Sequence, residues 1–140
     1  QIMPPLDNAQ IAALFNRDQF AAGNCMRVVE VRPGYARAEM TVTPSHMNAV
    51  GILQGGAVFT LADLAFAAAC NSHGVVAVAC QADISFFKPV KSGHLTATAD
   101  EIARTRSLST CLVKVANEQG EPIALFKGIA FIKGDPLPLL

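Results

Sequence analysis

The stretch 55–70 constrains this chain more than any other, because it is apolar almost throughout and carries one charged side chain, Asp63. A segment that is apolar nearly all round forms a helix that is buried on most of its sides. We therefore predict a central helix over 55–73. Burying a carboxylate costs free energy unless the group is paired or hydrogen-bonded, and burial raises its pKa. Asp63 is for this reason the first candidate for a functional residue.

The size and composition predict one domain over 1–140 that associates with copies of itself. Hydrophobic residues make up 51% of the chain and charged residues 16%, which indicates that further surface is hidden in an oligomer. The 11 basic and 11 acidic residues give no net charge, so neither nucleic acid nor a membrane surface is an expected partner. The apolar stretch is also shorter than the ~20 residues of a membrane-spanning helix, and Asp63 interrupts it.

The cysteines and the N-terminal residues favour a cytoplasmic protein. Asp7, Asn8 and Gln10 stand where a signal peptide would have its apolar core. The three histidines lack metal-ligand spacing, so we expect no metal site. No Cys-x-x-Cys spacing occurs either, and we expect four buried, reduced thiols, at Cys25, Cys70, Cys80 and Cys111.

Around the central helix, the pattern predicts one further helix and six strands. The apolar spacing over 7–20 is helical, and Asp7 is a suitable N-cap. A loose tail is expected over 134–140. Six strands that form a curved antiparallel sheet around one helix make an α+β fold. The predicted strands, from alternating residues bounded by turn signals, cover 27–32, 35–43, 75–87, 94–104, 108–117 and 122–133.

The residues that lead into the central helix resemble a known signature. Asn48, the glycine pair 55–56 and Asp63 follow one another at the spacing found in hot dog-fold thioesterases, most closely the phenylacetyl-CoA thioesterase (PaaI-like) group. The later run Ile-Ser-Phe-Phe-Lys-Pro over 84–89 is similar to the family strand that ends in a basic residue and proline. The family usually has His directly before the glycine pair. This chain has Gln54, which can hydrogen-bond but cannot be protonated.

The resemblance implies a hot dog fold, with a curved sheet wrapped around a long central helix, and hydrolysis of an acyl-CoA to the free acid and coenzyme A. It implies no cofactor, since coenzyme A is part of the substrate, and it implies dimers that pair into tetramers. It assigns the oxyanion donor to the backbone N–H of Gly55, at a helix N-terminus that favours negative charge. Asp63 then acts as a general base or a nucleophile, and Asn48 orients water or the thioester carbonyl.

The spacing of two of these residues predicts that each site is shared between subunits. Gly55 and Asp63 are eight positions apart, which is about 12 Å along one helix axis. Reacting groups must approach within roughly 3–3.5 Å of one another. Both residues can serve one substrate if each comes from a different subunit. We therefore expect an obligate dimer with two composite sites.

Further residues are candidates for contacts with the substrate. Thr60 lies on the same side of the helix as Asp63, and either steadies its carboxylate or back-bonds within the helix. Phe59 is a candidate for an acyl pocket, with core packing as the alternative. Other candidates, from the glycine turn and the strand after the helix, are Gln54, Gly56, Cys80 and Gln81. A basic rim is expected for the phosphates of coenzyme A, with solvated surface charge as the alternative for each candidate: Lys88, Lys91, Arg104 and Arg106.

Two other functions are compatible with the fold that the resemblance implies. A non-catalytic acyl-CoA-binding or regulatory protein would be expected to lack the acid on the helix, yet Asp63 is present. A hydratase or dehydratase typically uses a His with an acid, but position 54 is Gln and the central helix has no His before its predicted end at His73. The leading prediction is therefore an acyl-CoA thioesterase that acts on an arylacetyl group or on a short- to medium-chain acyl group.

Overall fold

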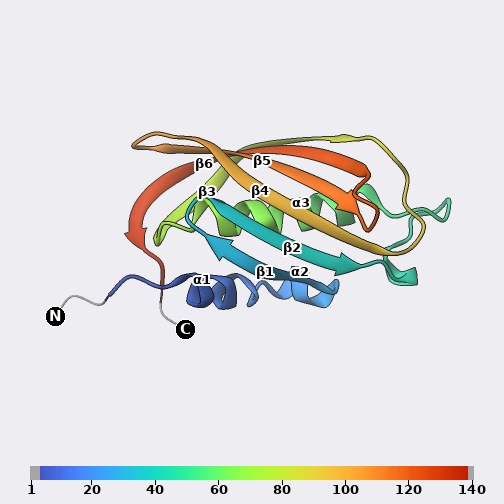
Figure 1. The fold of residues 1–140 in the computed structure, drawn as a ribbon, viewed down its shortest axis with the longest axis horizontal. Helices are drawn as coiled ribbons and strands as arrows, with labels where there is room; N and C mark the ends of the chain where they lie inside the picture. The colour runs from blue at the N-terminus through green and yellow to red at the C-terminus, as the bar shows by residue number, and fades with distance from the viewer. Residues whose placement is uncertain (1–3, 139–140) are drawn as a thin grey trace.

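The computed structural model describes residues 4–138, in which a six-stranded antiparallel sheet curves around the central helix α3 (Gly55–Cys70), as Figure 1 shows. The strand order is β1-β2-β4-β5-β6-β3, so β1 and β3 are the outer strands. The predicted α+β arrangement is thereby confirmed. The strands are β1 (Met26–Arg32), β2 (Tyr35–Thr41), β3 (Val75–Phe86), β4 (His94–Arg104), β5 (Leu108–Asn117) and β6 (Pro122–Pro136).

The core lies between α3 and the inner face of the sheet. Alternate strand residues point inward and are fully buried, as the pattern of β4 and β5 shows. Most of α3 is buried. One partly exposed stripe runs along the helix and includes Gly56, Thr60, Asp63 and Ala67. Phe66 packs so closely on β6 that a Cβ at Gly128 would come within 2.7 Å of its ring. Only a glycine allows this approach of helix and sheet.

The two outer strands differ in how they are covered. The helices α1 (Asn8–Phe15) and α2 (Gln19–Gly23) lie against β1. The Asn16 amide, just after α1, exchanges two hydrogen bonds with the backbone of Val28, at 2.7 and 2.9 Å. On β3, the six consecutive residues 78–83 are exposed, and among residues 4–138 no strand pairs with its outer edge. Such an edge is a surface to which another chain can add a strand.

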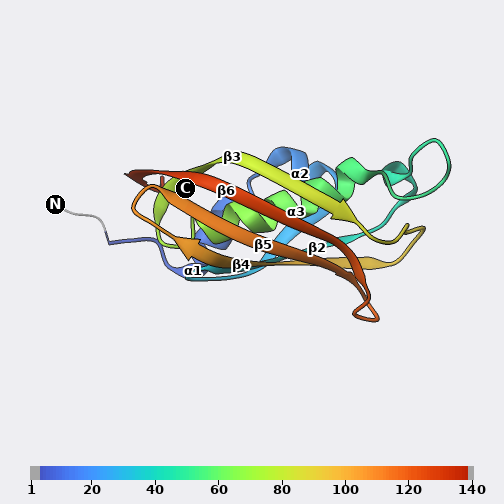
Figure 2. The ribbon, with the colours of Figure 1, turned by 90° about the horizontal axis from the view of Figure 1, so that it is seen from above.

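The segment between β2 and α3 projects beyond one end of the sheet (Figure 2) and is held by His46. The His46 side chain is 4% exposed and belongs to the 3-10 turn η1 (Pro44–His46). Its Nδ1 accepts from the N–H of Thr43 at 3.0 Å, and its Nε2–H donates to the carbonyl of Asn24 at 2.8 Å. The backbone carbonyl of His46 accepts from the N–H of Gln54 at 2.9 Å. One buried residue thus fixes both ends of the loop 47–53.

Two predicted helices have different boundaries in the structure. Asp7 is the N-cap of α1, as predicted. The single helix expected over 7–20 is nevertheless two helices, because Asp18 caps a new start by accepting from the N–H of Ala21 at 2.9 Å. The central helix ends at Cys70 rather than at 73, since the Asn71 side chain donates to the carbonyl of Ala67 in the last turn and to the carbonyl of Ala77 in β3.

Two other expectations are also corrected. The loose tail expected over 134–140 belongs to β6 as far as Pro136, and the N–H of Leu137 donates to Gly74 at 3.0 Å; residues 139–140 lie outside the described range. Of the four cysteines expected to be buried, Cys70 and Cys111 are buried, whereas the other two are exposed; all four are unpaired. Within residues 4–138, no helix is both long and apolar enough to cross a membrane.

Candidate active site

Two depressions flank the first turn of α3. The first, the Gly55 cavity, has a volume of about 300 Å³ and is lined by Asn48, Gly55, Val58, Phe86, Lys88, Ile123 and neighbouring apolar residues. The second, the Gly56 groove, has a volume of about 510 Å³ and is lined by Phe20, His46, Gln54, Gly56, Phe59, Thr60 and their neighbours. The adjacent glycines therefore face different depressions.

The first backbone N–H of α3 is free to act as a donor. Gln54 caps the helix, since its side-chain oxygen accepts from the N–H of Gly56 and its carbonyl accepts from the N–H of Ala57 at 2.9 Å. The N–H of Gly55 has no acceptor among residues 4–138. A Cβ at Gly55 would lie 3.2 Å from the ring of Phe86. A side chain at this position would crowd Phe86 and any ligand that approaches the N–H.

Asn48 brings a second free donor to the Gly55 cavity. Its Oδ1 accepts from the N–H groups of Val50 at 3.0 Å and Ile52 at 3.2 Å, which fixes the orientation of the side-chain amide. Within residues 4–138, nothing accepts a hydrogen bond from its Nδ2. Two neutral donors beside the positive end of a helix suit an oxygen that develops negative charge.

Asp63 lies two turns further along α3 and lines neither depression. Its side chain is half-buried, and no hydrogen bond or ion pair from residues 4–138 satisfies the carboxylate. Burial raises the pKa of Asp63 above its usual range, and the carboxylate of Asp18 raises it further. The hydroxyl of Thr60 donates to the carbonyl of Gly56 at 2.7 Å, so Thr60 back-bonds within the helix and does not steady Asp63.

The other predicted residues are distributed around the molecule. Lys88, a candidate for the basic rim, lines the Gly55 cavity. Phe59 lines the Gly56 groove and also packs edge-on against Phe126, with 5.2 Å between ring centroids. Four predicted residues are exposed and line neither depression: Cys80, Gln81, Lys91 and Arg106.

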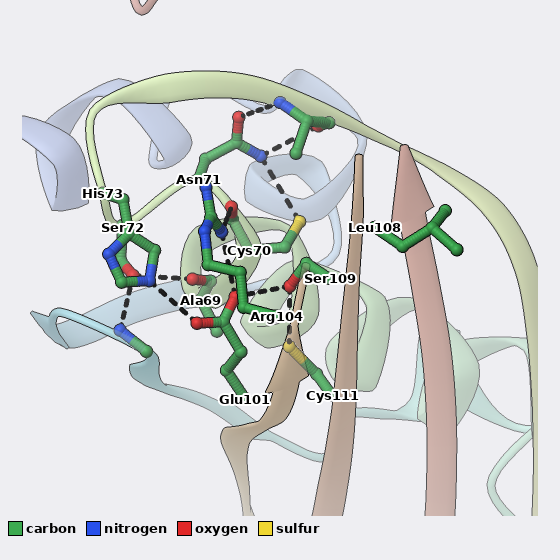
Figure 3. Close-up of polar contacts among 12 residues, drawn as sticks. Ala69, Cys70, Asn71, Ser72, His73, Glu101, Arg104, Leu108, Ser109 and Cys111 are labelled. Atoms are coloured by element: carbon green, nitrogen blue, oxygen red, sulfur yellow. Dashed lines mark hydrogen bonds and ion pairs between the residues drawn. The ribbon is translucent and has the colours of Figure 1, made fainter. Parts of the chain in front are cut away.

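Arg104 lies at the opposite end of α3, in a polar network that Figure 3 shows. Its Nη1 donates to the carboxylate of Glu101 at 3.0 Å and lies 3.5 Å from the carbonyl of Cys70. Glu101 also accepts from Ser109 at 2.5 Å and from His73 at 2.8 Å. Arg104 therefore holds the end of the helix and does not line the Gly55 cavity. Burial raises the pKa of Cys70 to about 12, so this thiol is not reactive at neutral pH.

Three residues near the site were not predicted from the sequence. Phe86 packs over Gly55, and the family-like run over 84–89 was a signal that could have identified it. His46 holds the loop that carries Asn48. Glu121 forms an ion pair with Lys88. The contacts of His46 and Glu121 join residues far apart in the sequence, which no local pattern reports.

Comparisons with known proteins identify the family of this chain. The family described as the thioesterase superfamily matches residues 50–124. The acyl-coenzyme A thioesterase PaaI of Escherichia coli is 36% identical over 117 residues, which cover 83% of this chain and 84% of that protein. A putative esterase of Archaeoglobus fulgidus is 40% identical over 113 residues, covering 80% and 73% of the two chains. The solved structure of the E. coli PaaI protein superposes with a TM-score of 0.87 at 32% identity, covering 93% and 95%.

A curved antiparallel sheet around one central helix, with glycines at the start of that helix, is the architecture of the hot dog fold. The chain belongs to the thioesterase superfamily, in its PaaI-like group, and is a thioester hydrolase. The resemblance inferred from the residues that lead into the central helix is confirmed.

Proposed function

We propose that this protein is an acyl-CoA thioesterase, which hydrolyses an acyl-CoA to the free acid and coenzyme A. The observation that carries the proposal is the free N–H of Gly55 beside the free amide of Asn48 at one cavity. A thioester carbonyl that accepts from both donors is polarised, and the negative charge that develops on its oxygen is stabilised. The relative from E. coli is named an acyl-coenzyme A thioesterase, which supports this substrate class.

Asp63 supplies the remaining chemistry in this proposal. Its carboxylate lacks a counter-ion among residues 4–138, and its raised pKa brings it towards the working pH, as suits a general base. As a base it takes a proton from the water that attacks the carbonyl. As a nucleophile it attacks the carbonyl itself, and water then hydrolyses the mixed anhydride. After turnover in ¹⁸O-labelled water, label in the Asp63 carboxylate identifies a nucleophile whose anhydride water opens at the Asp63 carbonyl.

The proposal includes a dimer in which Gly55 of one subunit and Asp63 of the other act on one thioester. Both residues belong to the same straight element, α3, about 12 Å apart along its axis. The open edge of β3, with exposed residues over 78–83, supports strand pairing between two copies. Such pairing would also cover the partly exposed stripe of α3 on which Asp63 lies. Alignment of the two strands as an antiparallel pair gives a two-fold axis, as a closed dimer requires.

Further parts of the proposal concern assembly, substrate and location. Val78, Leu108 and Phe131 are exposed and lie opposite one another on the outer face of β3, β5 and β6, which supports pairing of dimers into a tetramer. The E. coli structure is of a protein from the phenylacetic acid degradation operon, which makes phenylacetyl-CoA the first substrate to test. Four unpaired cysteines are in keeping with the cytoplasm.

The release of free thiol from acyl-CoA tests the proposed function. Wild type, Asp63→Asn and Asp100→Asn are incubated with phenylacetyl-CoA and with straight-chain acyl-CoAs of increasing length. Asp100 is an exposed acid on β4 and serves as the matched control. We expect turnover by wild type and by Asp100→Asn, and a loss of at least a hundredfold in Asp63→Asn. Equal turnover by all three proteins would remove Asp63 from its role. Binding of coenzyme A without turnover would favour the non-catalytic alternative.

A further inference from the structure

We propose that Glu121 lowers the affinity of the active site for phosphorylated thioesters, by holding a negative charge beside Lys88, which lines the Gly55 cavity. The inference rests on the proposed function, since it concerns how the phosphates of coenzyme A are received. It makes Glu121 a residue that sets how tightly substrate and product bind. It assigns Glu121 no part in breaking the thioester bond.

The carboxylate of Glu121 is fixed in place. One oxygen forms an ion pair with the Lys88 Nζ, and the other accepts from the Asn117 side-chain amide at 3.1 Å. Asn117 in turn accepts from the backbone N–H of Glu121 at 2.9 Å, so both residues are locked in the turn between β5 and β6. These contacts hold the Glu121 carboxylate beside the Lys88 ammonium. Glu121 does not itself line the Gly55 cavity, but it contacts the cavity rim through its ion pair with Lys88, which is a lining residue.

The charge of Glu121 persists at neutral pH. Hydrogen bonds from Lys88 and Asn117 hold the pKa of Glu121 below its usual range. Both partners of the ion pair are about half exposed, with 47% of each side chain accessible. Exposed ion pairs contribute little to stability, so the pair is not needed for folding. The charge of Glu121 acts instead on the binding of other anions that approach Lys88.

An incoming phosphate meets both charges at once. The Lys88 ammonium attracts it, but the fixed carboxylate repels it and occupies one of the three ammonium donors. The net attraction at the rim is therefore smaller than that of a lone lysine. The released coenzyme A carries the same phosphates as the substrate, so Glu121 weakens the product complex by the same factor. A hydrolase gains from this arrangement because its product leaves faster.

The test compares Glu121→Gln with wild type and with Glu118→Gln. Glutamine keeps an acceptor for Asn117 and removes the charge. Glu118 lies in the same turn, but it accepts from the backbone N–H of His94 at 2.8 Å rather than from Lys88, so it is the matched control. Each protein is assayed with an acyl-CoA and with the corresponding S-acyl-pantetheine, which has no phosphate. Inhibition by free coenzyme A is measured alongside.

For Glu121→Gln, we expect the KM for acyl-CoA and the inhibition constant for coenzyme A to fall together, by about two- to fivefold. The KM for S-acyl-pantetheine should not change, and the difference should shrink as salt is raised. Glu118→Gln should match wild type in every assay. An unchanged or raised KM for acyl-CoA in Glu121→Gln would overturn the proposal. A raised KM would mean that Glu121 positions Lys88 for the phosphate instead of opposing phosphate binding.

A separate measurement keeps this test independent of turnover. Calorimetric titration with coenzyme A alone reports the same affinity difference in a protein that hydrolyses nothing. Tighter binding by Glu121→Gln without hydrolysis by wild type would support the inference while the proposed function fails. Absence of coenzyme A binding in both proteins would overturn the inference.

Discussion

Removing the carboxylate of Glu101 should destabilise the protein strongly, because this group ties the end of α3 to two strands (Figure 3). The Glu101 side chain is 8% exposed and accepts from Ser109, His73 and Arg104. A hydrogen bond to a charged group contributes about 1.5–3 kcal/mol, and among residues 4–138 the fully buried Ser109 has no second partner of comparable strength for its hydroxyl. The bonds from the partly exposed His73 and Arg104 add less, since water replaces them.

For Glu101→Ala we therefore expect a loss of about 3 kcal/mol in the free energy of unfolding. The corresponding fall in melting temperature is roughly 10 °C for a chain of this length. Urea unfolding followed by circular dichroism at pH 7 measures the loss, at one protein concentration because association adds to apparent stability. The double variant with Ser109→Ala should lose less than the sum of the two single variants, because they share one hydrogen bond.

The stability lost in Glu101→Ala should depend on pH, because the pKa of Glu101 is lowered in the folded protein. Burial raises the pKa of Glu101, but the hydrogen bonds from Ser109, His73 and Arg104 outweigh burial and hold it below the ordinary 4.5. A depressed carboxyl pKa stabilises the fold above the unfolded value, and the stabilisation is lost as pH falls through the folded value. The gap between wild type and Glu101→Ala should therefore be full at pH 7 and narrow below pH 4.5. A gap under about 1 kcal/mol at pH 7, or one that is constant down to pH 3, would refute the reasoning.

Three further variants test other parts of the structure. His46→Ala leaves the backbone N–H of Thr43 and the backbone carbonyl of Asn24 without the partner that His46 supplies and loosens the loop that carries Asn48, so the unfolding free energy should fall by about 2 kcal/mol and kcat/KM should fall with it; an unchanged urea midpoint and unchanged kinetics would contradict this. Asp18→Asn keeps the helix cap but removes the charge that raises the pKa of Asp63, so the acid limb of the kcat/KM profile should move to lower pH; a limb that stays in place or rises counts against it. Gly128→Ala places a methyl 2.7 Å from the Phe66 ring and should cost about 1–3 kcal/mol on thermal unfolding, unless Phe66→Leu accompanies it; an undiminished melting temperature in the single variant would be the contrary result.

The fold was largely predictable because its strands and its helix bury one face each. Alternation in 94–104 and 108–117 predicts β4 and β5 with their observed bounds, since the buried inner face of the sheet imposes a period of two. The helix boundaries were less predictable. They depend on which side chain takes the terminal hydrogen bonds, and Asp18 and Asn71 do so in ways that apolar spacing does not reveal.

The candidate site was predictable where its parts are close in sequence. Gly55 and Asn48, to which the sequence reasoning assigned roles at the thioester, line one cavity. The structure was needed to show that Gln54 caps the helix. Its side chain accepts from the N–H of Gly56, and the N–H of Gly55 is left without an acceptor among residues 4–138. The pairing of Lys88 with Glu121 also needed the structure, since the two are 33 residues apart in the chain. Contacts of this kind depend on strand pairing, which composition and periodicity do not determine.

Complementation between two inactive variants tests the composite active site most directly. Asp63→Asn and Gly55→Val are each purified, shown to be inactive, and mixed in equal amounts until subunit exchange is complete. A mixed dimer has one site with both variant residues and one site with the original Gly55 and Asp63. Because half of the dimers are mixed, thioesterase activity should return to about a quarter of the wild-type value. No activity after exchange has been confirmed would contradict the shared site.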